Sequence, residues 1–314
     1  MATDPERQRQ HLVSRGYQQN FADDHRVAVL DAQTGATLDP RRPTRSNWRV
    51  DDFLTVVDPT GHRDDSLERE FAKTERATLG QIRDITRTRI SLEQRRALDL
   101  LAAVHLVRSE SFVAVHGQVT DAFFDNWPAD YIADSRTRLQ ELFVADRGRQ
   151  PEPGELQNLV DALTRKFQAS PDLTANGMRH VTAGIPRLLA RYRVQLVEAP
   201  SWMSGFVLAD QPVVQHARPD EGRYGFASQL AVGDADLIMV PIKRRLLAFY
   251  TVQPLANRNF TLETKRGLRV INAALCRNAV KEVACHPDDA RDVSNVIRHI
   301  DQHPASVLTD GTLK

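Results

Sequence analysis

Cysteine is scarce in this sequence, whose 314 residues include only Cys276 and Cys285. Two cysteines are too few for a disulfide framework, and they favour a reducing compartment. Their separation, with His286 beside the second, does not match the ligand spacing of a zinc site. We therefore interpret Cys276 as a core residue on an apolar helix face, and we expect a cytoplasmic protein.

Long apolar runs are missing as well. No run approaches the roughly 18 residues that a membrane helix needs, and the first ten residues are polar where a signal peptide would be apolar. The charges are almost balanced, with 42 Lys and Arg against 41 Asp and Glu, which gives a formal net charge of +1. No membrane partner is therefore expected, and no overall field favours a polyanion.

Nucleic acid is a candidate partner through local features only. Three Trp and five Tyr offer little for base stacking. Two arginine-rich groups could contact nucleic acid or another phosphate-containing ligand, or could simply solvate the surface. They are Arg83, Arg87, Arg89, Arg95 and Arg96, and Arg179, Arg187, Arg191 and Arg193.

Established catalytic motifs are also absent. The sequence has no phosphate loop and no metal-ligand signature, and Ser204-Gly-Phe does not fit the Gly-x-Ser-x-Gly pattern of a nucleophile elbow. The sequence names no cofactor, and a divalent metal is kept as the candidate for a hydrolytic site. The sequence contains no internal repeat, and it leaves the oligomeric state open.

What is present is an order of elements typical of an α+β protein. Strands are predicted at 26–31, 48–57, 206–209, 237–240 and 246–252, and helices at 65–85, 91–126, 155–167, 174–197, 262–283 and 287–299. We expect one compact domain over residues 1–314, with a helical middle packed on a mixed sheet built from both ends of the chain. The linker-like segment 146–154 is the candidate for a sub-domain boundary.

The first two helices are expected to form an antiparallel hairpin. Asp65 with Glu68, and Ser91 with Gln94, have the spacing of capping boxes. Glu75 and Arg108 then fall on the apolar stripes of the two helices, where a charge is costly unless it is paired or functional. We predict a direct ion pair between them, which could fix the hairpin register or serve a catalytic or anion-binding site.

The opening segment carries a resemblance to a known family. His11, Val13, Tyr17 and Phe21 match a motif of the type His-Tyr-Val-Pro-x-x-Tyr-Leu-x-x-Phe, while Ser14 and Gln18 replace its proline and leucine. With these residues the chain resembles the bacterial family called domain of unknown function 4238. The resemblance implies a fold, and it transfers no activity.

Further motifs extend the resemblance over roughly residues 11–285. A Leu-Glu helix start, a further helical acid, a late helical arginine, an Asp-x-Pro segment and a late asparagine are expected in such proteins. They match Leu67-Glu68, Glu75, Arg108, Asp210-Gln-Pro212 and Asn272, and Val240-Pro241-Ile242 loosely matches a Pro-Leu-Ser/Thr-Pro segment. The hydroxyl residues that precede the aspartate in the family are Leu208 and Ala209 here.

Asp210 and His11 complete the candidate site. A carboxylate after an apolar strand is a common catalytic placement, although Asp-Gln-Pro is also good turn chemistry. We predict that Asp210 ends a central strand and opens onto the same cavity as Arg108. His11 could act as a general acid or base, or be an ordinary surface or core histidine. We predict that it packs against the C-terminal half.

Two functions are weighed for these residues. The first is a hydrolase for a phosphodiester, nuclease-like, with a site of His11, Glu75, Arg108 and Asp210. The second is a non-catalytic binding or regulatory module in bacterial stress or phage defence, with the same residues as a structural polar network. An enzyme needs the four side chains on one open pocket, whereas a structural network would be sealed and fully hydrogen-bonded.

Overall fold

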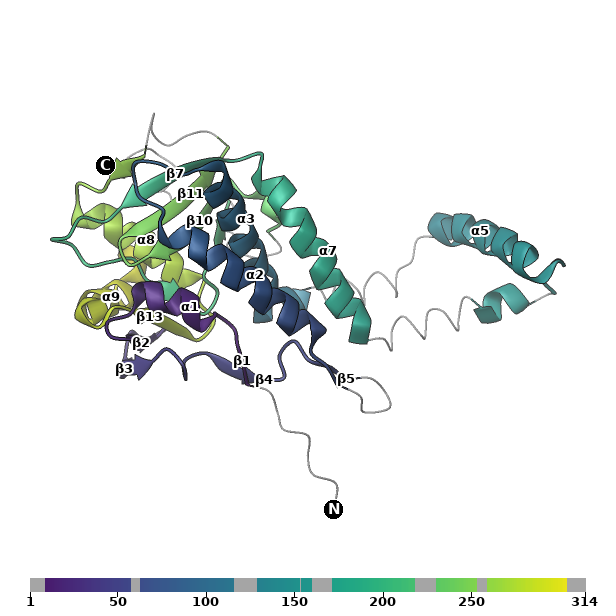
Figure 1. The fold of residues 1–314 in the computed structure, drawn as a ribbon, viewed down its shortest axis with the longest axis horizontal. Helices are drawn as coiled ribbons and strands as arrows, with labels where there is room; N and C mark the ends of the chain where they lie inside the picture. Colours follow the sequence, from purple (N-terminus) through teal and green to yellow (C-terminus); the bar gives the residue numbers. More distant parts are fainter. Residues whose placement is uncertain are drawn as a thin grey trace, which may run out of the picture.

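The fold class is the α+β class expected from the sequence. The computed structural model describes residues 9–57, 63–115, 129–152, 154–159, 171–217, 230–252 and 259–303. Helices occupy the middle of the chain, and strands come from both ends (Figure 1). Among the described residues, no helix has the length and apolar character needed to cross a membrane.

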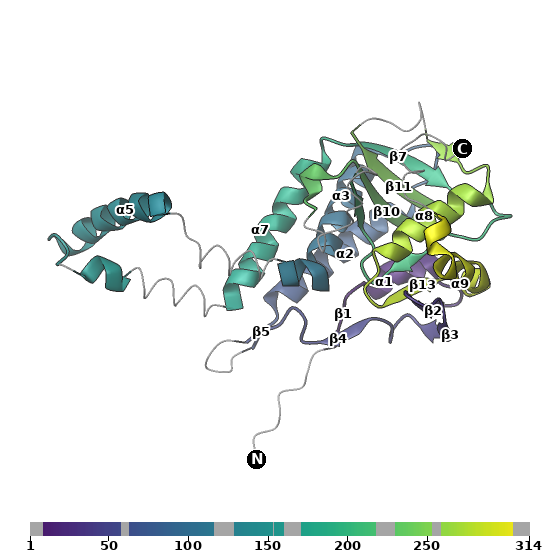
Figure 2. The same cartoon turned by 180° about the vertical axis from the view of Figure 1, so that it is seen from behind.

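Three long helices form the helical layer. They are α2 (Ser66–Arg83), α3 (Leu92–Val107) and α7 (Pro171–Leu189), and they lie side by side in both views (Figures 1 and 2). The predicted hairpin is present, because α2 and α3 are consecutive and packed together. Helix α5 (Ala129–Arg147) lies apart from this layer (Figure 2).

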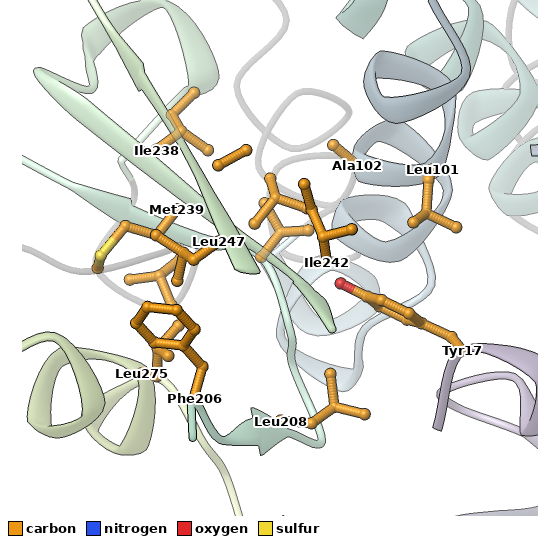
Figure 3. Close-up of a cluster of buried hydrophobic side chains, with 14 of the residues drawn as sticks. Tyr17, Leu101, Ala102, Phe206, Leu208, Ile238, Met239, Ile242, Leu247 and Leu275 are labelled. Atoms are coloured by element: carbon orange, nitrogen blue, oxygen red, sulfur yellow. The ribbon is translucent and has the colours of Figure 1, made fainter. Parts of the chain in front are cut away.

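The larger sheet has the strand order β12-β7-β11-β10-β9. Its strands are β7 (Arg193–Glu198), β9 (Val214–His216), β10 (Leu237–Lys243), β11 (Leu246–Thr251) and β12 (Phe260–Thr261). The β12–β7 pair is parallel and the other pairs are antiparallel. Leu101 and Ala102 of α3 lie on one side of this sheet and Leu275 of α8 (Lys265–Arg277) on the other (Figure 3). Both faces are thus buried, which explains the continuous apolar runs of β10 and β11.

A second sheet joins the two ends of the chain, with the order β3-β2-β13-β8. Its strands are β2 (Arg26–Asp31), β3 (Thr37–Pro43), β8 (Leu208–Ala209) and β13 (Glu282–Cys285), all paired antiparallel. Helix α9 (Ala290–Arg298) packs on β2 and β3. Two small ribbons, β1 (Arg9–His11) with β4 (Arg49–Asp51) and β5 (Val56–Val57) with β6 (Arg63–Asp64), complete the N-terminal part.

The opening motif covers the free edge of β10. Strand β9 pairs only with the first half of β10, and α1 (Arg15–Gln18) lies beside the rest. The Tyr17 hydroxyl donates to the Pro241 carbonyl, and Asn20 Nδ2 donates to the Ile242 carbonyl at 3.1 Å. Figure 3 shows Tyr17 extended toward this end of the strand. An edge that would otherwise expose unpaired backbone groups is thereby closed.

Several predicted boundaries were wrong. Helix α3 ends at Val107 instead of running on to 126. Residues 108–109 break it, 110–115 are helical again, and 116–128 lie outside the described residues. Residues 193–197 of the predicted helix 174–197 belong to strand β7. Helix α8 ends at Arg277, and residues 282–283 of the predicted helix 262–283 belong to β13. In both cases an apolar run that suits either period pairs with a strand distant in sequence, which a local pattern does not contain.

Two smaller features also differ from expectation. Ser91 and Gln94 do form a capping box, but Asp65 makes no capping bond and instead accepts a hydrogen bond from Thr55 Oγ1 at 2.6 Å. Glu68 turns away from the helix end toward Arg108.

Candidate functional site

Glu75 lies on the buried face of α2. Leu67, Phe71, Leu79 and Ile82 fill the same face at helical spacing. The Glu75 side chain is therefore carried into the core by the helix period itself, and the residue is only 4% exposed. A carboxylate in this position requires a partner.

Arg108 provides that partner from the break after α3. Its backbone N–H still bonds to the Val104 carbonyl, but its dihedral angles (φ −81°, ψ 51°) leave the helix. Ser109 stabilises the break, because its hydroxyl donates to the Leu106 carbonyl at 3.0 Å and accepts from the Phe112 N–H at 3.0 Å. The arginine is 2% exposed, so its guanidinium is held inside the protein.

The predicted ion pair between Glu75 and Arg108 is confirmed, and it is part of a larger group. Arg108 Nη1 lies 3.2 Å from Glu75 Oε2, and Arg108 Nη2 lies 2.6 Å from Glu68 Oε2. One cation thus bridges two carboxylates of α2. The members of such a buried ion pair compensate each other's charge, and removing one member strongly lowers the free energy of unfolding.

His105 adds a buried imidazole to the group. Its Nε2 lies 3.4 Å from Glu75 Oε1, and its ring packs against Tyr17 with centroids 4.9 Å apart. Neither ring nitrogen of His105 has a hydrogen bond of good geometry among the described residues. The polar group is therefore not fully hydrogen-bonded, in contrast to what a sealed structural network would require.

The group borders an open cavity of about 310 Å³. His11 and Ser14 line it from the N-terminal segment, and Arg15 and Arg76 add two further cations at its wall. The complete lining is His11, Ser14, Arg15, Gly16, Glu68, Ala72, Glu75, Arg76, Leu79 and Arg108. Three of the four predicted site residues, His11, Glu75 and Arg108, therefore meet at one cavity, which we call the α2 cavity.

Burial shifts the two acid–base groups of the α2 cavity in opposite directions. Burial raises the pKa of Glu75 to about 7, and nearby Glu68 raises it further, whereas Arg108 acts against the shift. Burial lowers the pKa of His11, with Arg49 as the next cause. A protonated Glu75 carboxyl and a neutral His11 imidazole can therefore coexist just below pH 7. Such opposed shifts mark an acid and a base in many active sites.

Asp210 does not share this cavity, and that prediction was wrong. It follows β8, an edge strand rather than a central one. Its carboxylate accepts the backbone N–H groups of Val280, Lys281 and Glu282 at 2.8–3.0 Å. Burial raises the pKa of Asp210, and its backbone hydrogen bonds act against that shift. The turn interpretation of Asp-Gln-Pro explains these contacts.

His11 is ordered but does not pack against the C-terminal half. Its Nε2 lies 3.3 Å from the Arg45 carbonyl and 3.5 Å from Arg49 Nε, both in the N-terminal part. Tyr17 and Asn20 of the same motif make the contacts with β10 instead. Within the motif, His11 therefore lines the cavity, whereas Tyr17 lies in the core.

The asparagine highlighted by the resemblance has a backbone partner. Asn272 is 2% exposed. Its Nδ2 donates to the Gly205 carbonyl at 3.0 Å, and its Oδ1 accepts from the Val207 N–H at 3.2 Å. Asn272 thus holds the segment before β8 in place.

Sequence reasoning missed His105, Arg15 and Arg76 as members of the site. His105 had a readable signal, since it lies three residues before Arg108 on the same apolar stripe. Arg15 and Arg76 had none, because arginines beside a capping serine or on a helix flank are common on surfaces.

The arginine-rich groups are partly occupied by ion pairs. Arg87 pairs with Glu198 at 3.0 Å, Arg95 with Asp99 at 2.8 Å, and Arg179 with Glu70 at 3.0 Å. Within the described ranges, no three or more His, Cys, Asp or Glu side chains are placed to hold a metal ion together. We derive no chemical step through a metal.

The family comparison assigns the chain. Residues 9–289 match the family model described as a protein of unknown function (DUF4238). The chain belongs to this family, as the motifs of its sequence indicated. Searches of curated proteins and of solved structures gave no match.

The buried His105 makes a testable contribution to acid sensitivity. Burial lowers its pKa from 6.5 to about 3, so the folded protein keeps this imidazole neutral while the unfolded chain binds a proton. Its stabilising contribution is present above pH 6.5 and is lost as the pH falls toward 3. Relative to a His105→Phe variant, the wild-type free energy of unfolding should fall by about 1.4 kcal/mol more per pH unit in this window.

Urea unfolding of both proteins at several pH values measures this difference. The pKa of Glu75 is raised in the folded state, so its protonation increases the free energy of unfolding as the pH falls from 7 to 4.5. Only the difference between the two proteins therefore isolates the effect of His105. Parallel pH curves for wild type and variant would contradict a buried neutral His105.

Proposed function

We propose that the protein is a hydrolase that acts on a phosphodiester at the α2 cavity. The observation that carries the proposal is the convergence of His11, Glu75 and Arg108 on one open cavity, with Arg15 and Arg76 beside them. The two peripheral arginines supply positive charge for a phosphate. The substrate class is a small phosphodiester or nucleic acid, and the setting is the cytoplasm, in keeping with two buried free cysteines.

The opposed pKa shifts of His11 and Glu75 favour, just below pH 7, the protonation states that such a reaction needs. Neutral His11 takes a proton from the attacking water as a new P–O bond forms. Protonated Glu75 gives its proton to the leaving oxygen as the old P–O bond breaks. Arg108 does not hold the phosphate in this scheme, because both of its terminal nitrogens already contact Glu68 and Glu75. It orients the general acid instead.

The rate should depend on pH as a bell-shaped curve. On the acid side activity falls as His11 becomes protonated, below its ordinary value of 6.5 because its pKa is lowered. On the alkaline side it falls as Glu75 loses its proton, near pH 7. The optimum should therefore lie just below pH 7.

Hydrolysis of bis(p-nitrophenyl) phosphate and of a single-stranded oligonucleotide tests the proposal. His11→Asn and Glu75→Gln should each lower kcat by about 100-fold, the size expected for one general acid or base. Glu75→Gln should also remove the alkaline limb of the pH profile. Assays with Mg²⁺ and with a chelator establish whether a divalent metal takes part.

Glu70→Gln is the matched control, because Glu70 is an exposed carboxylate of the same helix outside the cavity. It should leave kcat unchanged. If the wild type hydrolyses neither substrate, or if Glu75→Gln retains full activity, the hydrolase proposal fails.

A second function is supported by the contacts of Arg108. With two carboxylates on one guanidinium, the group also fits a structural network inside a non-catalytic binding or regulatory module. In that case Glu75→Gln would change the free energy of unfolding, and no variant would alter any turnover.

A further inference from the structure

A second cavity also borders the β1–β4 ribbon, and it shares no lining residue with the α2 cavity. It has a volume of about 300 Å³, within the range of small-molecule sites. Its walls come from widely separated segments: Leu12, Arg42, Ser46, Trp48, Arg49, Val50, Glu110, Asp210, Gln211, Val280, Lys281 and Glu282. We call it the Trp48 cavity.

The charges of the Trp48 cavity leave one cation available. Arg42 pairs with Glu282 at 2.9 Å, and Lys281 pairs with Glu110 at 2.9 Å. The carboxylate of Asp210 is occupied by backbone N–H groups. In the part of the chain that the structure describes, Arg49 has no carboxylate partner, and its one side-chain contact is with His11 at 3.5 Å. An anion entering the cavity would therefore meet an exposed guanidinium whose charge is not neutralised.

The remaining wall is apolar and strained. Leu12, Val50 and Val280 face the cavity together with Trp48. Trp48 has φ of 52°, a left-handed conformation that is a true outlier for a bulky side chain. Its indole Nε1 is buried with no hydrogen-bond acceptor among the described residues. Strain and an unpaired donor at one wall are features that folded proteins retain mainly at functional sites.

We propose that the Trp48 cavity binds a small organic anion with an apolar body. Its carboxylate or phosphate lies against Arg49, and its apolar part lies against Leu12, Trp48 and Val50. Acceptor oxygens suit this site because the polar group left over, the Arg49 guanidinium, is a donor only. The proposal stands independently of the hydrolase, since it concerns a different cavity and needs no turnover.

Benzoate is the probe, read by ¹⁹F NMR of protein labelled with 5-fluorotryptophan. The chain has three tryptophans, and a Trp48→Phe variant assigns the Trp48 resonance. Millimolar benzoate should shift this resonance saturably. Trp202, which is 61% exposed, should not move and serves as the internal reference. Phenyl phosphate in a second titration distinguishes a phosphate ligand from a carboxylate ligand.

Three comparisons give the outcome. Arg49→Met should weaken benzoate binding by about tenfold or more, because a charge-assisted contact is lost. Arg45→Gln changes an exposed arginine of the turn before β4, outside the cavity, and should leave benzoate binding unchanged. Benzamide, the neutral relative of benzoate, should bind as weakly as benzoate binds Arg49→Met. An unmoved Trp48 resonance, or equal binding by Arg49→Met or by benzamide, overturns the proposal.

Discussion

Replacing Arg108 by methionine should lower the free energy of unfolding by about 3–5 kcal/mol at pH 8. The variant leaves Glu68 and Glu75 side by side without their shared cation, and Glu75 is 4% exposed. The loss should shrink as the pH falls below about 7, because a protonated Glu75 needs no counter-charge. Urea denaturation of the variant and the wild type at pH 8 and pH 5.5 measures both effects.

Two further variants show whether the effect belongs to the buried pair. Arg179→Met removes an ion pair in which Arg179 and Glu70 are 31% and 54% exposed, and it should cost less than about 1 kcal/mol. Adding Glu75→Gln to Arg108→Met should recover part of the loss, since one uncompensated charge is then gone. A loss for Arg108→Met as small as that for Arg179→Met would mean that the interior solvates the carboxylates without the arginine.

Replacing Asp210 by alanine should cost about 3–4 kcal/mol, because three backbone N–H groups would lose their acceptor at once. These donors belong to 280–282, the turn that leads into β13. The sheet register between β13 and β8 depends on that turn. Thermal and urea unfolding measure the loss.

Asp210→Asn provides the graded comparison, since it keeps one carbonyl oxygen as an acceptor. Its cost should be about half that of the alanine variant. If the α2 cavity is the hydrolytic site that we propose, its turnover should persist in any Asp210→Asn protein that remains folded. If Asp210→Ala is as stable as the wild type, the structural role of Asp210 is contradicted, and Asp210 is again a candidate functional carboxylate.

Residues on one helix face were predictable from the sequence. Glu75 and Arg108 interrupt apolar stripes, and a helix carries every third or fourth side chain to the same side. Their meeting followed from the short connection between two helices. The same periodicity places His105 on the same stripe. A histidine at such a position does not indicate which side chains it contacts.

Contacts between distant strands were not predictable in this way. The turn chemistry of Asp210 was readable, but its partners at 280–282 depend on the pairing of β8 with β13. The boundary at Val107 was hidden for a similar reason, since the apolar pattern continues through Phe112 while Ser109 redirects the backbone. Local patterns set the faces of elements, and long-range pairing sets which faces meet.

The pairing of β2 with β13 also sets when this protein can fold. During synthesis, β2 leaves the ribosome early, whereas β13 leaves it only after most of the chain has been made. Until Cys285 emerges, Val27 to Leu30 have no strand beside them on that edge. Contacts between residues so far apart in sequence slow folding, and until they form the nascent chain is prone to aggregation. A message truncated before the codon for Glu282 would therefore yield a product destined for chaperones or proteases, even though every residue of the α2 cavity had been translated.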